Sequence, residues 1–230
     1  MKKIVIFGTG EIAELAYFYM KNDDFCNFNV VAFCCDPQFI DNSEFQKLPV
    51  VSFHEVEKTY PSSEYSMHVA LSYNKLNLIR KKKYYEAKEK GYELVSYVSS
   101  KSVVSSDLNI GDNCLILENQ TIQPKVIIGN NVMIWSGNHL GHGCKIKDHT
   151  YLSSHICISG YTEIGERCFI GVNSSFKDYI QVGDEVFITM GSSVTTDVED
   201  KAVILGPQST VLTSDKKLAK KIRSKYFNLE

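Results

Sequence analysis

The stretch from residue 104 to residue 194 repeats with a period of six residues. Every sixth position holds a large apolar side chain through sixteen consecutive repeats. These anchors are Val104, Ile110, Ile116, Ile122, Ile128, Ile134, Leu140, Ile146, Leu152, Ile158, Ile164, Ile170, Phe176, Val182, Ile188 and Val194. Only about a third of the residues of an ordinary globular chain would qualify, so chance does not produce this run.

A period of six excludes the two simple secondary structures. A helix would repeat every 3.6 residues and a half-buried strand every 2. A short strand followed by a turn fits, with three such units in a coil and the coils stacked as a parallel β-helix. We expect about five coils of about 18 residues each, so that residues eighteen apart in sequence lie above one another.

Two other positions of the repeat are also patterned. We interpret the glycine that often follows the anchor as a tight corner that needs a permissive backbone. The fourth residue after the anchor is mostly small or β-branched, which predicts burial and explains three of the cysteines. The glycines are Gly111, Gly129, Gly141, Gly165, Gly171 and Gly183, and the cysteines are Cys114, Cys144 and Cys168.

The first hundred residues alternate between strand and helix patterns. Strands are expected at residues 4–7, 29–36, around 68–73 and at 93–98, with helices after residue 10 and from about residue 75 to 90. This alternation predicts an α/β domain with a small, Rossmann-like parallel sheet. The end of the chain reads as a basic amphipathic helix that caps or flanks the solenoid. We therefore divide the chain into residues 1–100, 101–213 and 214–230.

A glycine motif follows the first predicted strand. Gly8-x-Gly10-x-x-Ala13, with Asp36 ending the second strand, approximates a dinucleotide fingerprint. In that fingerprint the glycines let a phosphate approach a helix N-terminus and the acid takes a ribose hydroxyl. A strand-to-helix turn that binds no ligand can have the same sequence pattern, so such a turn stays an alternative. A nicotinamide cofactor is disfavoured, because about a hundred residues do not hold both dinucleotide halves and a substrate domain.

Composition excludes several classes of partner. The formal net charge is −2 and no basic block is present, so nucleic acid is not expected. No stretch approaches the roughly 18 apolar residues of a spanning helix, and the N-terminal apolar run is too short for a signal peptide. We expect a cytoplasmic protein without a membrane partner. The seven cysteines lack CxxC spacing, which disfavours a disulfide framework and a zinc ribbon.

The order of these parts resembles the bacterial nucleotide-sugar acetyltransferases of the sialic-acid and bacillosamine type. The resemblance covers nearly the whole chain and is carried by IVIFGTGEIAE at the start and by GHGCKI, ISG, EIG and CFIG in the repeats. It implies a left-handed β-helix, a homotrimer, and acetyl-CoA bound between neighbouring solenoids. It also implies an N-acetyltransferase acting on a nucleotide-linked amino sugar for surface glycan, including lipopolysaccharide, biosynthesis.

The resemblance also assigns roles to residues. The family's catalytic histidine matches His142, which lies on an outward position two residues after an anchor. An imidazole there could take the proton of the substrate amine. Gly160 matches the glycine whose N–H stabilises the thioester oxyanion, and it lies one coil from His142. The expected substrate-binding residues are Gly8, Gly10, Glu11, Asp36, Asn138 and His139, and the expected cofactor-binding residues are Tyr151, Gly160 and Gly191.

Two positions depart from the family pattern. Gly143 replaces the aspartate that follows the catalytic histidine, so another carboxylate or a backbone carbonyl is expected to orient the imidazole. Tyr151 replaces a second histidine, which in the family is associated with the thioester end of coenzyme A. Of the remaining histidines, His149 is expected on the surface and His155 has no assigned role.

The expected mechanism is direct transfer in a ternary complex, without a covalent intermediate. Cys157 has no basic neighbour in sequence that would activate it as a nucleophile. Three alternatives stay open. An O-acetyltransferase would use the same groove, and a trimeric zinc β-helix enzyme would use histidines such as His139, His142 and His155, although no metal is expected. A non-catalytic nucleotide-sugar sensor would bind its ligand without turnover.

Overall fold

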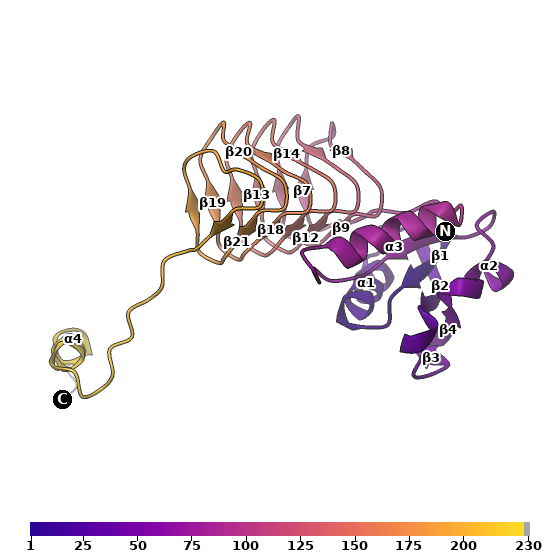
Figure 1. The fold of residues 1–230 in the computed structure, drawn as a ribbon, viewed down its shortest axis with the longest axis horizontal. Helices are drawn as coiled ribbons and strands as arrows, with labels where there is room; N and C mark the ends of the chain where they lie inside the picture. Colours follow the sequence, from indigo (N-terminus) through magenta and orange to yellow (C-terminus); the bar gives the residue numbers. More distant parts are fainter. Residues whose placement is uncertain (228–230) are drawn as a thin grey trace.

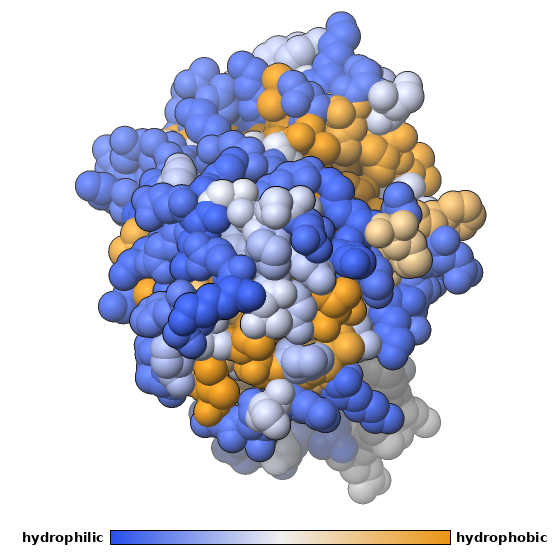
Figure 2. All heavy atoms as spheres, turned by 90° about the vertical axis from the view of Figure 1, so that its right-hand side faces the viewer, coloured by the Kyte–Doolittle hydropathy of each residue, from blue (hydrophilic) through white to orange (hydrophobic). Residues whose placement is uncertain are grey.

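The computed structural model describes residues 1–227 and shows a sheet domain, a β-helix and a separate C-terminal helix in succession (Figure 1). The sheet domain lies at one end of the β-helix. Seen from that end, its surface is mostly hydrophilic with scattered apolar patches (Figure 2). The expected boundaries at residues 100 and 213 stay a prediction, because the two larger units share an apolar core.

The N-terminal domain has the predicted Rossmann-like winding. Its sheet has the strand order β3-β4-β2-β1-β5, in which β1, β2, β4 and β5 are parallel and β3 is antiparallel to β4. The strands are β1 (Lys2–Phe7), β2 (Phe28–Cys35), β3 (Glu44–Phe45), β4 (Leu48–Ser52) and β5 (Ser66–Val69). The helices are α1 (Glu11–Asn22), α2 (Val56–Thr59) and α3 (Leu78–Glu89), with 3₁₀ turns η1 (Pro37–Phe39) and η2 (Phe53–Glu55).

Two parts of this domain differ from the sequence prediction. The hairpin of β3 and β4 was not predicted, because a two-residue strand and a proline-containing strand give little periodic signal. The predicted last strand at residues 93–98 is split between the two units. Leu94 bridges Met67 of β5, whereas β6 (Tyr97–Val98) pairs with β9 of the β-helix.

The repeat region forms the predicted left-handed parallel β-helix, built from two-residue strands. Leu140 pairs with Ile122 on one side and with Ile158 on the other, so the register is eighteen residues, as predicted. The strands are β7 (Val103–Val104), β8 (Asn109–Ile110), β9 (Leu115–Ile116), β10 (Thr121–Ile122), β11 (Ile127–Ile128), β12 (Met133–Ile134), β13 (His139–Leu140), β14 (Lys145–Ile146), β15 (Tyr151–Leu152), β16 (Cys157–Ile158), β17 (Glu163–Ile164), β18 (Phe169–Ile170), β19 (Ser175–Phe176), β20 (Gln181–Val182), β21 (Phe187–Ile188), β22 (Ser193–Val194) and β23 (Val203–Ile204).

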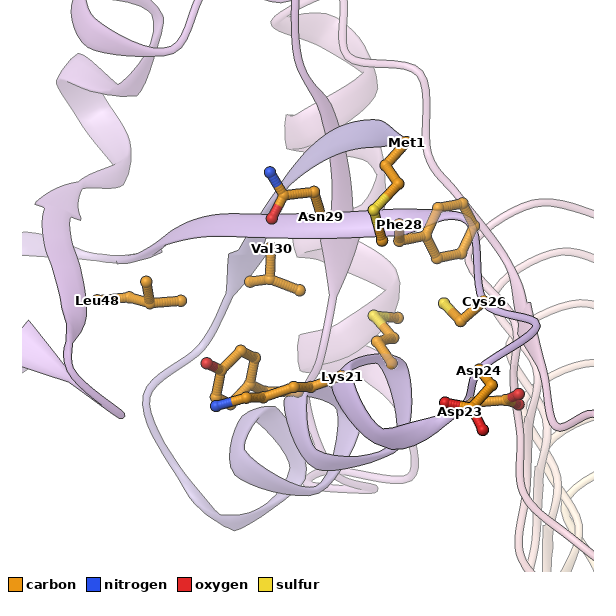
Figure 3. Close-up of a pocket in the computed structure, with 11 residues that line it drawn as sticks. Met1, Lys21, Asp23, Asp24, Cys26, Phe28, Asn29, Val30 and Leu48 are labelled. Carbon is orange, nitrogen blue, oxygen red and sulfur yellow. The ribbon is translucent and has the colours of Figure 1, made fainter.

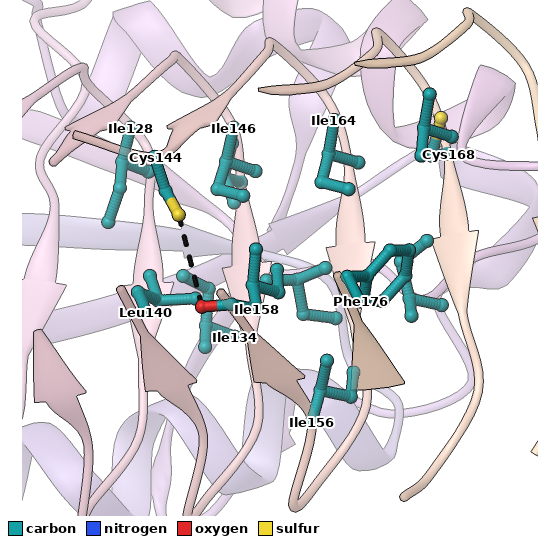
Figure 4. Close-up of a cluster of buried hydrophobic side chains, with 14 of the residues drawn as sticks. Ile128, Ile134, Leu140, Cys144, Ile146, Ile156, Ile158, Ile164, Cys168 and Phe176 are labelled. Carbon is teal, nitrogen blue, oxygen red and sulfur yellow. Dashed lines mark hydrogen bonds between the residues drawn. The ribbon is translucent and has the colours of Figure 1, made fainter. Parts of the chain in front are cut away.

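The anchors fill the interior of the coils in rows. Figure 4 shows Ile128, Ile146 and Ile164 along one side of the core, with a second row that contains Leu140 and Ile158. The three cysteines predicted at small positions are fully buried. The hydrophobic register assigned from the sequence is therefore confirmed.

The glycines after the anchors have a different role from the one predicted. The corner residue with positive φ is the third after the anchor, as at Tyr161 with φ 56°. Gly141 is needed instead for close stacking of coils, because a Cβ there would lie 2.8 Å from Gly160 N. The glycines after the anchors are therefore explained by the narrow spacing between coils and not by a positive φ angle.

A buried arginine joins the N-terminal domain to the β-helix. Arg80 of α3 is only 2 % exposed, and its guanidinium donates to the backbone oxygens of Asn131 and His149, the latter at 3.0 Å. It also donates to Asn77 Oδ1 at 2.9 Å. Burial lowers the pKa of Arg80 to about 10. A buried charge is tolerated when several acceptors surround it, so this contact holds α3 against the corners of the coils.

The basic helix at the end of the chain forms but does not cap the solenoid. Helix α4 (Lys217–Phe227) stands away from the last coil at the end of an extended segment (Figure 1). Its side chains at Leu218, Ile222 and Tyr226 are exposed. The prediction that this helix covers the coils is therefore wrong for the described residues, and residues 228–230 of the predicted segment lie outside them.

A substitution in the core tests the assigned register. Ile164 has no exposed surface, so Ile164→Asp places a carboxylate without partners among apolar side chains and should prevent folding. Ser175→Asp, on an outward position of the same solenoid, should fold normally. Soluble yield and circular dichroism measure both, and an ordered, soluble Ile164→Asp protein would refute the register.

Candidate active site

His142 and Gly160 lie together at one edge of the β-helix. His142 follows β13, is exposed, and sits one coil from Gly160, as predicted from the eighteen-residue register. The imidazole lies directly against Gly160, because a Cβ added there would be 2.8 Å from His142 Cε1. Any side chain at residue 160 would displace the imidazole, so the pairing of these two residue types is a steric requirement.

The imidazole contacts a glutamine that the sequence analysis did not identify. Gln123 Oε1 accepts a hydrogen bond from the His142 backbone N–H at 2.8 Å and lies 3.3 Å from His142 Nδ1. We expected a carboxylate or a backbone carbonyl in this role, and that expectation is wrong. A neutral carboxamide from the preceding coil contacts the histidine instead.

A tyrosine occupies the space left open by Gly143. A Cβ on Gly143 would lie 2.6 Å from Tyr161 Cδ1, so the aspartate of the family pattern has no room here. The Tyr161 ring meets the His142 ring edge to face, with centroids 5.0 Å apart. Tyr179 stacks on Tyr161 at 5.2 Å. Glycine at position 143, where the family pattern has aspartate, therefore leaves room for the stacked rings of Tyr161 and Tyr179 along this edge of the β-helix.

The backbone around Gly160 leaves one donor available. Tyr161 N–H donates to His142 O at 2.9 Å, and Gly160 O accepts from Tyr179 N–H at 3.1 Å. Within residues 1–227 no backbone carbonyl accepts from Gly160 N–H. Such an unpaired donor beside an imidazole has the chemical character of an oxyanion site.

The structure separates several other predicted residues from this edge. His139 lies on β13, half-buried, in register with Thr121 and Cys157. Asn138 is 1 % exposed, and its amide forms hydrogen bonds within the β-helix. Its Oδ1 accepts from the Ile156 N–H at 2.7 Å, and its Nδ2 donates to a backbone oxygen. The assignment of Asn138 to substrate binding is therefore contradicted by its burial.

Tyr151 is also buried. It is 4 % exposed, stacks on Phe169 at 5.2 Å and is covered by Tyr73 at 5.1 Å. Burial raises the pKa of Tyr151 to about 12. This ring faces the N-terminal domain, so the structure contradicts its assignment to coenzyme A binding.

Gly191 and His155 share a different edge from His142. Gly191 is a corner with φ 71° and open space around it, so its assignment to the cofactor stays a prediction. The ring of His155 lies against Gly137, where an added Cβ would be 2.6 Å from His155 Nδ1. The structure gives His155 a packing contact with the neighbouring coil.

The surface position predicted for His149 is wrong. The side chain is 1 % exposed because α3 covers it, with Tyr84 and Tyr85 packed against the ring. Its Nδ1 lies 2.9 Å from Asn131 Nδ2. Burial lowers the pKa of His149 to about 4, and burial does the same to His68.

These two histidines should make folding sensitive to acid. Above pH 6.5, the usual histidine value, both are neutral in the folded and unfolded chain and have no effect. Between about pH 6.5 and 4 the unfolded chain binds the protons first. The free energy of unfolding should therefore fall by up to ~1.4 kcal/mol per pH unit for each histidine.

The contribution of His149 can be isolated by substitution. His149→Gln keeps a hydrogen-bond acceptor for Asn131 and should make the acid dependence shallower, whereas His54→Gln, at an exposed position, should not. Urea unfolding between pH 7.5 and 5 measures this. An unchanged pH slope in His149→Gln would contradict the assignment of a neutral, buried imidazole.

The glycine motif lies where the fingerprint predicts, between β1 and α1. Gly8 has φ 123°, and a Cβ there would lie 2.7 Å from Ala70 O. Gly10 begins α1, is exposed and has open space beside it. A hollow of about 190 Å³ adjoins this turn, lined by Thr9 and by residues between 39 and 50. The backbone at this edge is therefore open to a ligand.

Charged side chains of both signs lie near the glycine turn. Asp36 forms a 2.7 Å ion pair with Lys83 of α3, whose Nζ also bonds Glu86. Burial alone would lower the pKa of Lys83, but the bonds to the two carboxylates outweigh it and raise the pKa. Glu11 and Glu14 occupy the first turn of α1. The glycine turn thus has a half-buried cation, paired with two carboxylates, near its strands and two acids on its helix.

A larger hollow lies at the opposite edge of the sheet. It measures about 500 Å³ and is bordered by Met1, Phe28, Lys21 and Leu48 (Figure 3). These residues lie at the starts of β1, β2 and β4 and at the end of α1. In parallel sheets ligands bind at the carboxyl ends of the strands, so this hollow is not the expected nucleotide site.

Two further observations concern metal binding and membrane insertion. In the part of the chain that the structure describes, no group of three or more His, Cys, Asp or Glu side chains is placed to hold a metal ion. Across the same residues, no helix has the length and apolar character needed to cross a bilayer.

The repeats match two family models. Residues 125–155 match the model described as bacterial transferase hexapeptide (six repeats), and residues 161–196 match the hexapeptide repeat of succinyl-transferase. The acyl-[acyl-carrier-protein]–UDP-N-acetylglucosamine O-acyltransferase of Sinorhizobium fredii is 29 % identical over 81 residues, covering 32 % of this chain and 30 % of that protein. The Agrobacterium fabrum enzyme of the same name is 27 % identical over 71 residues, covering 28 % and 26 %. The match thus spans less than a third of these relatives.

Solved structures resemble nearly the whole chain. A histidine-to-asparagine mutant of perosamine N-acetyltransferase from Caulobacter crescentus, in complex with CoA and GDP-perosamine, has a TM-score of 0.78 and 22 % identity over 88 % of this chain and 93 % of that chain. The acetyltransferase domain of PglB from Neisseria gonorrhoeae, in complex with acetyl coenzyme A, has a TM-score of 0.78 and 19 % identity over 88 % and 95 %. The chain therefore has the fold of these acetyltransferases, with hexapeptide repeats of the bacterial transferase type at its centre.

Proposed function

We propose that this protein transfers an acetyl group from acetyl-CoA to the amine of a nucleotide-linked amino sugar. The observation that carries the proposal is the pairing, at one edge of the β-helix, of an exposed imidazole with a glycine N–H that has no backbone acceptor among residues 1–227. The shared fold with structures that hold CoA and GDP-perosamine supports the same reaction. We also propose that the reaction takes place in the cytoplasm and belongs to surface-glycan synthesis.

The proposed reaction is a direct transfer between two bound substrates. The sugar amine attacks the thioester carbonyl, and the N–H of Gly160 stabilises the negative charge that develops on the carbonyl oxygen. His142 accepts the proton that the amine loses, and coenzyme A leaves as its thiolate. The buried solenoid cysteines have no part in this reaction, since burial raises the pKa of the Cys144 thiol to about 11 and that of Cys168 to about 12.

The N-terminal domain is proposed to hold the nucleotide. Gly10 is exposed, with open space beside it, at the start of α1, where helix N–H groups attract anions, and Gly8 is buried in the turn before it. At the ends of β1 and β2, Asp36 pairs with Lys83 through one oxygen and offers its second oxygen to a base or a ribose. Glu11 and Glu14 would oppose a diphosphate placed directly on the first turn. We therefore place the base or ribose at Asp36 and the phosphates at the open backbone of Gly10, away from the carboxylates of Glu11 and Glu14.

Substitution of the proposed base tests the mechanism. His142→Ala should lower kcat by roughly two to four orders of magnitude and leave the affinity for the nucleotide sugar nearly unchanged, because the imidazole acts on the transferring proton. His139→Ala should act mainly on KM if that side chain contacts the sugar. Thiol release from acetyl-CoA measures these rates.

The controls for this experiment follow from burial. His54→Ala changes an exposed histidine of the N-terminal domain and should behave as wild type. His149→Ala is unsuitable as a neutral control, because it removes a buried side chain. Retention of more than about a tenth of wild-type kcat by His142→Ala, with chemistry limiting, would exclude the base role.

A homotrimer is part of the proposal, with each site between two solenoids. Its support is the set of exposed apolar side chains on several faces and corners of the coils, which on a monomer would mark interaction surfaces. They include Ile127, Tyr161, Val172, Tyr179, Phe187 and Met190.

Assembly and activity should therefore be inseparable. Light scattering of the active enzyme should give three times the chain mass of 26.0 kDa. Turnover per chain should fall on dilution through the dissociation range, because a monomer holds only half of each groove. A fully active species with the mass of one chain would contradict a site between subunits.

O-acetyl transfer is the second candidate function. The curated relatives that match the repeats are named as O-acyltransferases of UDP-N-acetylglucosamine. A hydroxyl is a poorer nucleophile than an amine and would depend on His142 more strongly. Treatment of the product with hydroxylamine separates the two functions, because an ester is cleaved and an amide is not.

A further inference from the structure

We propose that Gln123 is a positioning residue that sets the tautomer of His142. Its carboxamide oxygen holds the imidazole proton on Nδ1, and Nε2 is left with the lone pair that accepts the amine proton. The inference rests on the proposed role of His142 as the base, but the tautomer itself can be tested without turnover.

The orientation of the Gln123 amide is fixed by the backbone. The His142 N–H lies 2.8 Å from the atom assigned as Oε1. A backbone N–H can only donate, so the amide atom that faces it must be the oxygen. A flipped amide would place its NH2 group against this N–H and leave the backbone donor unsatisfied. One backbone contact therefore decides which end of the carboxamide faces the imidazole.

The tautomer of His142 follows from that orientation. Nδ1 lies 3.3 Å from the same oxygen, and an oxygen without a hydrogen can only accept. In a neutral imidazole one nitrogen carries the proton and the other carries the lone pair. A proton on Nδ1 completes the hydrogen bond, so Nε2 is the acceptor. The other contacts of the ring are Gly160 and the edge of Tyr161, and no ion pair within residues 1–227 involves His142.

The pattern of coil contacts explains why a glutamine is needed here. At equivalent corners the backbone N–H donates to a side chain of the following coil. The Asp112 N–H donates to Asn130 Oδ1, and the Asn130 N–H donates to Asp148 Oδ1. At His142 the following coil offers Gly160, which has no side chain. Gln123 reaches the same N–H from the preceding coil. Gly160 makes room for the imidazole but offers no side-chain acceptor to the His142 N–H. Gln123 supplies that acceptor from the preceding coil.

The consequence for catalysis is a base with a neutral partner. A carboxylate beside Nδ1 would hold the same tautomer and would also stabilise the imidazolium. The carboxamide supplies orientation without charge.

The tautomer can be read by ¹⁵N NMR of the full chain labelled at its six histidines. His142→Asn identifies the signal by its loss. In wild type at neutral pH, His142 should show a protonated Nδ1 and an unprotonated Nε2. Gln123→Leu should mix the two tautomers, and Gln123→Glu should restore the wild-type pattern because its oxygen still accepts.

Kinetics supply an independent measurement. Gln123→Leu should lower kcat about ten- to a hundredfold while KM for acetyl-CoA changes little, as expected when a reacting group loses its orientation. Gln123→Glu should keep most of kcat at high pH but move the acidic limb of the kcat profile up by about one pH unit, because a carboxylate favours the imidazolium. Gln181→Leu, at an exposed position on β20, should match wild type.

The possible outcomes separate the two proposals. A proton on Nε2 in wild type, or a tautomer unchanged in Gln123→Leu, overturns the role of Gln123 whatever the reaction is. If the tautomer behaves as described but His142→Ala remains active, the base role fails and the positioning of the ring by Gln123 stands. A loss of kcat in Gln123→Leu that Gln123→Glu does not restore also contradicts the proposal.

Discussion

The eighteen-residue register of the coils is the constraint on which the site depends. Backbone pairing of Leu140 with Ile122 and Ile158 places residues of three successive coils in one column. The stacking of these coils places Gly160 in one column with His142 and brings Gln123 beside them from the preceding coil. The spacing is narrow, and only glycine fits where a coil approaches its neighbour closely. The geometry of the imidazole is therefore a product of the core packing that holds the register.

The aromatic column beside His142 shows how one substitution requires another. A family-type aspartate after the histidine would compete with Tyr161 for the same space, since an added Cβ at Gly143 already lies 2.6 Å from that ring. The glycine admits the tyrosine, and the orienting task passes to Gln123 in the preceding coil. In the proposed site the imidazole and the oxyanion donor are kept, and a neutral partner takes the place of a charged one.

The sequence predicted the solenoid well because each repeat carries its own signal. The anchors, the coil register and the stacking of His142 on Gly160 all follow from a period of six. His149 and Tyr151 were misplaced because they are outward in the repeat but covered by the N-terminal domain, which periodicity does not report. Gln123 was missed because it contacts His142 from nineteen residues away, one position off the column. A search of both neighbouring positions in the preceding coil would have found it.

The central claim is that an amine-bearing nucleotide sugar receives the acetyl group directly from acetyl-CoA. The most direct test is thiol release from acetyl-CoA by the purified protein, with matched nucleotide sugars that carry an amine or a hydroxyl at the same carbon. The account predicts thiol release that depends on the amino sugar and an amide product of one added acetyl group. Binding of both ligands without thiol release, or equal turnover of the hydroxy sugar, would contradict it.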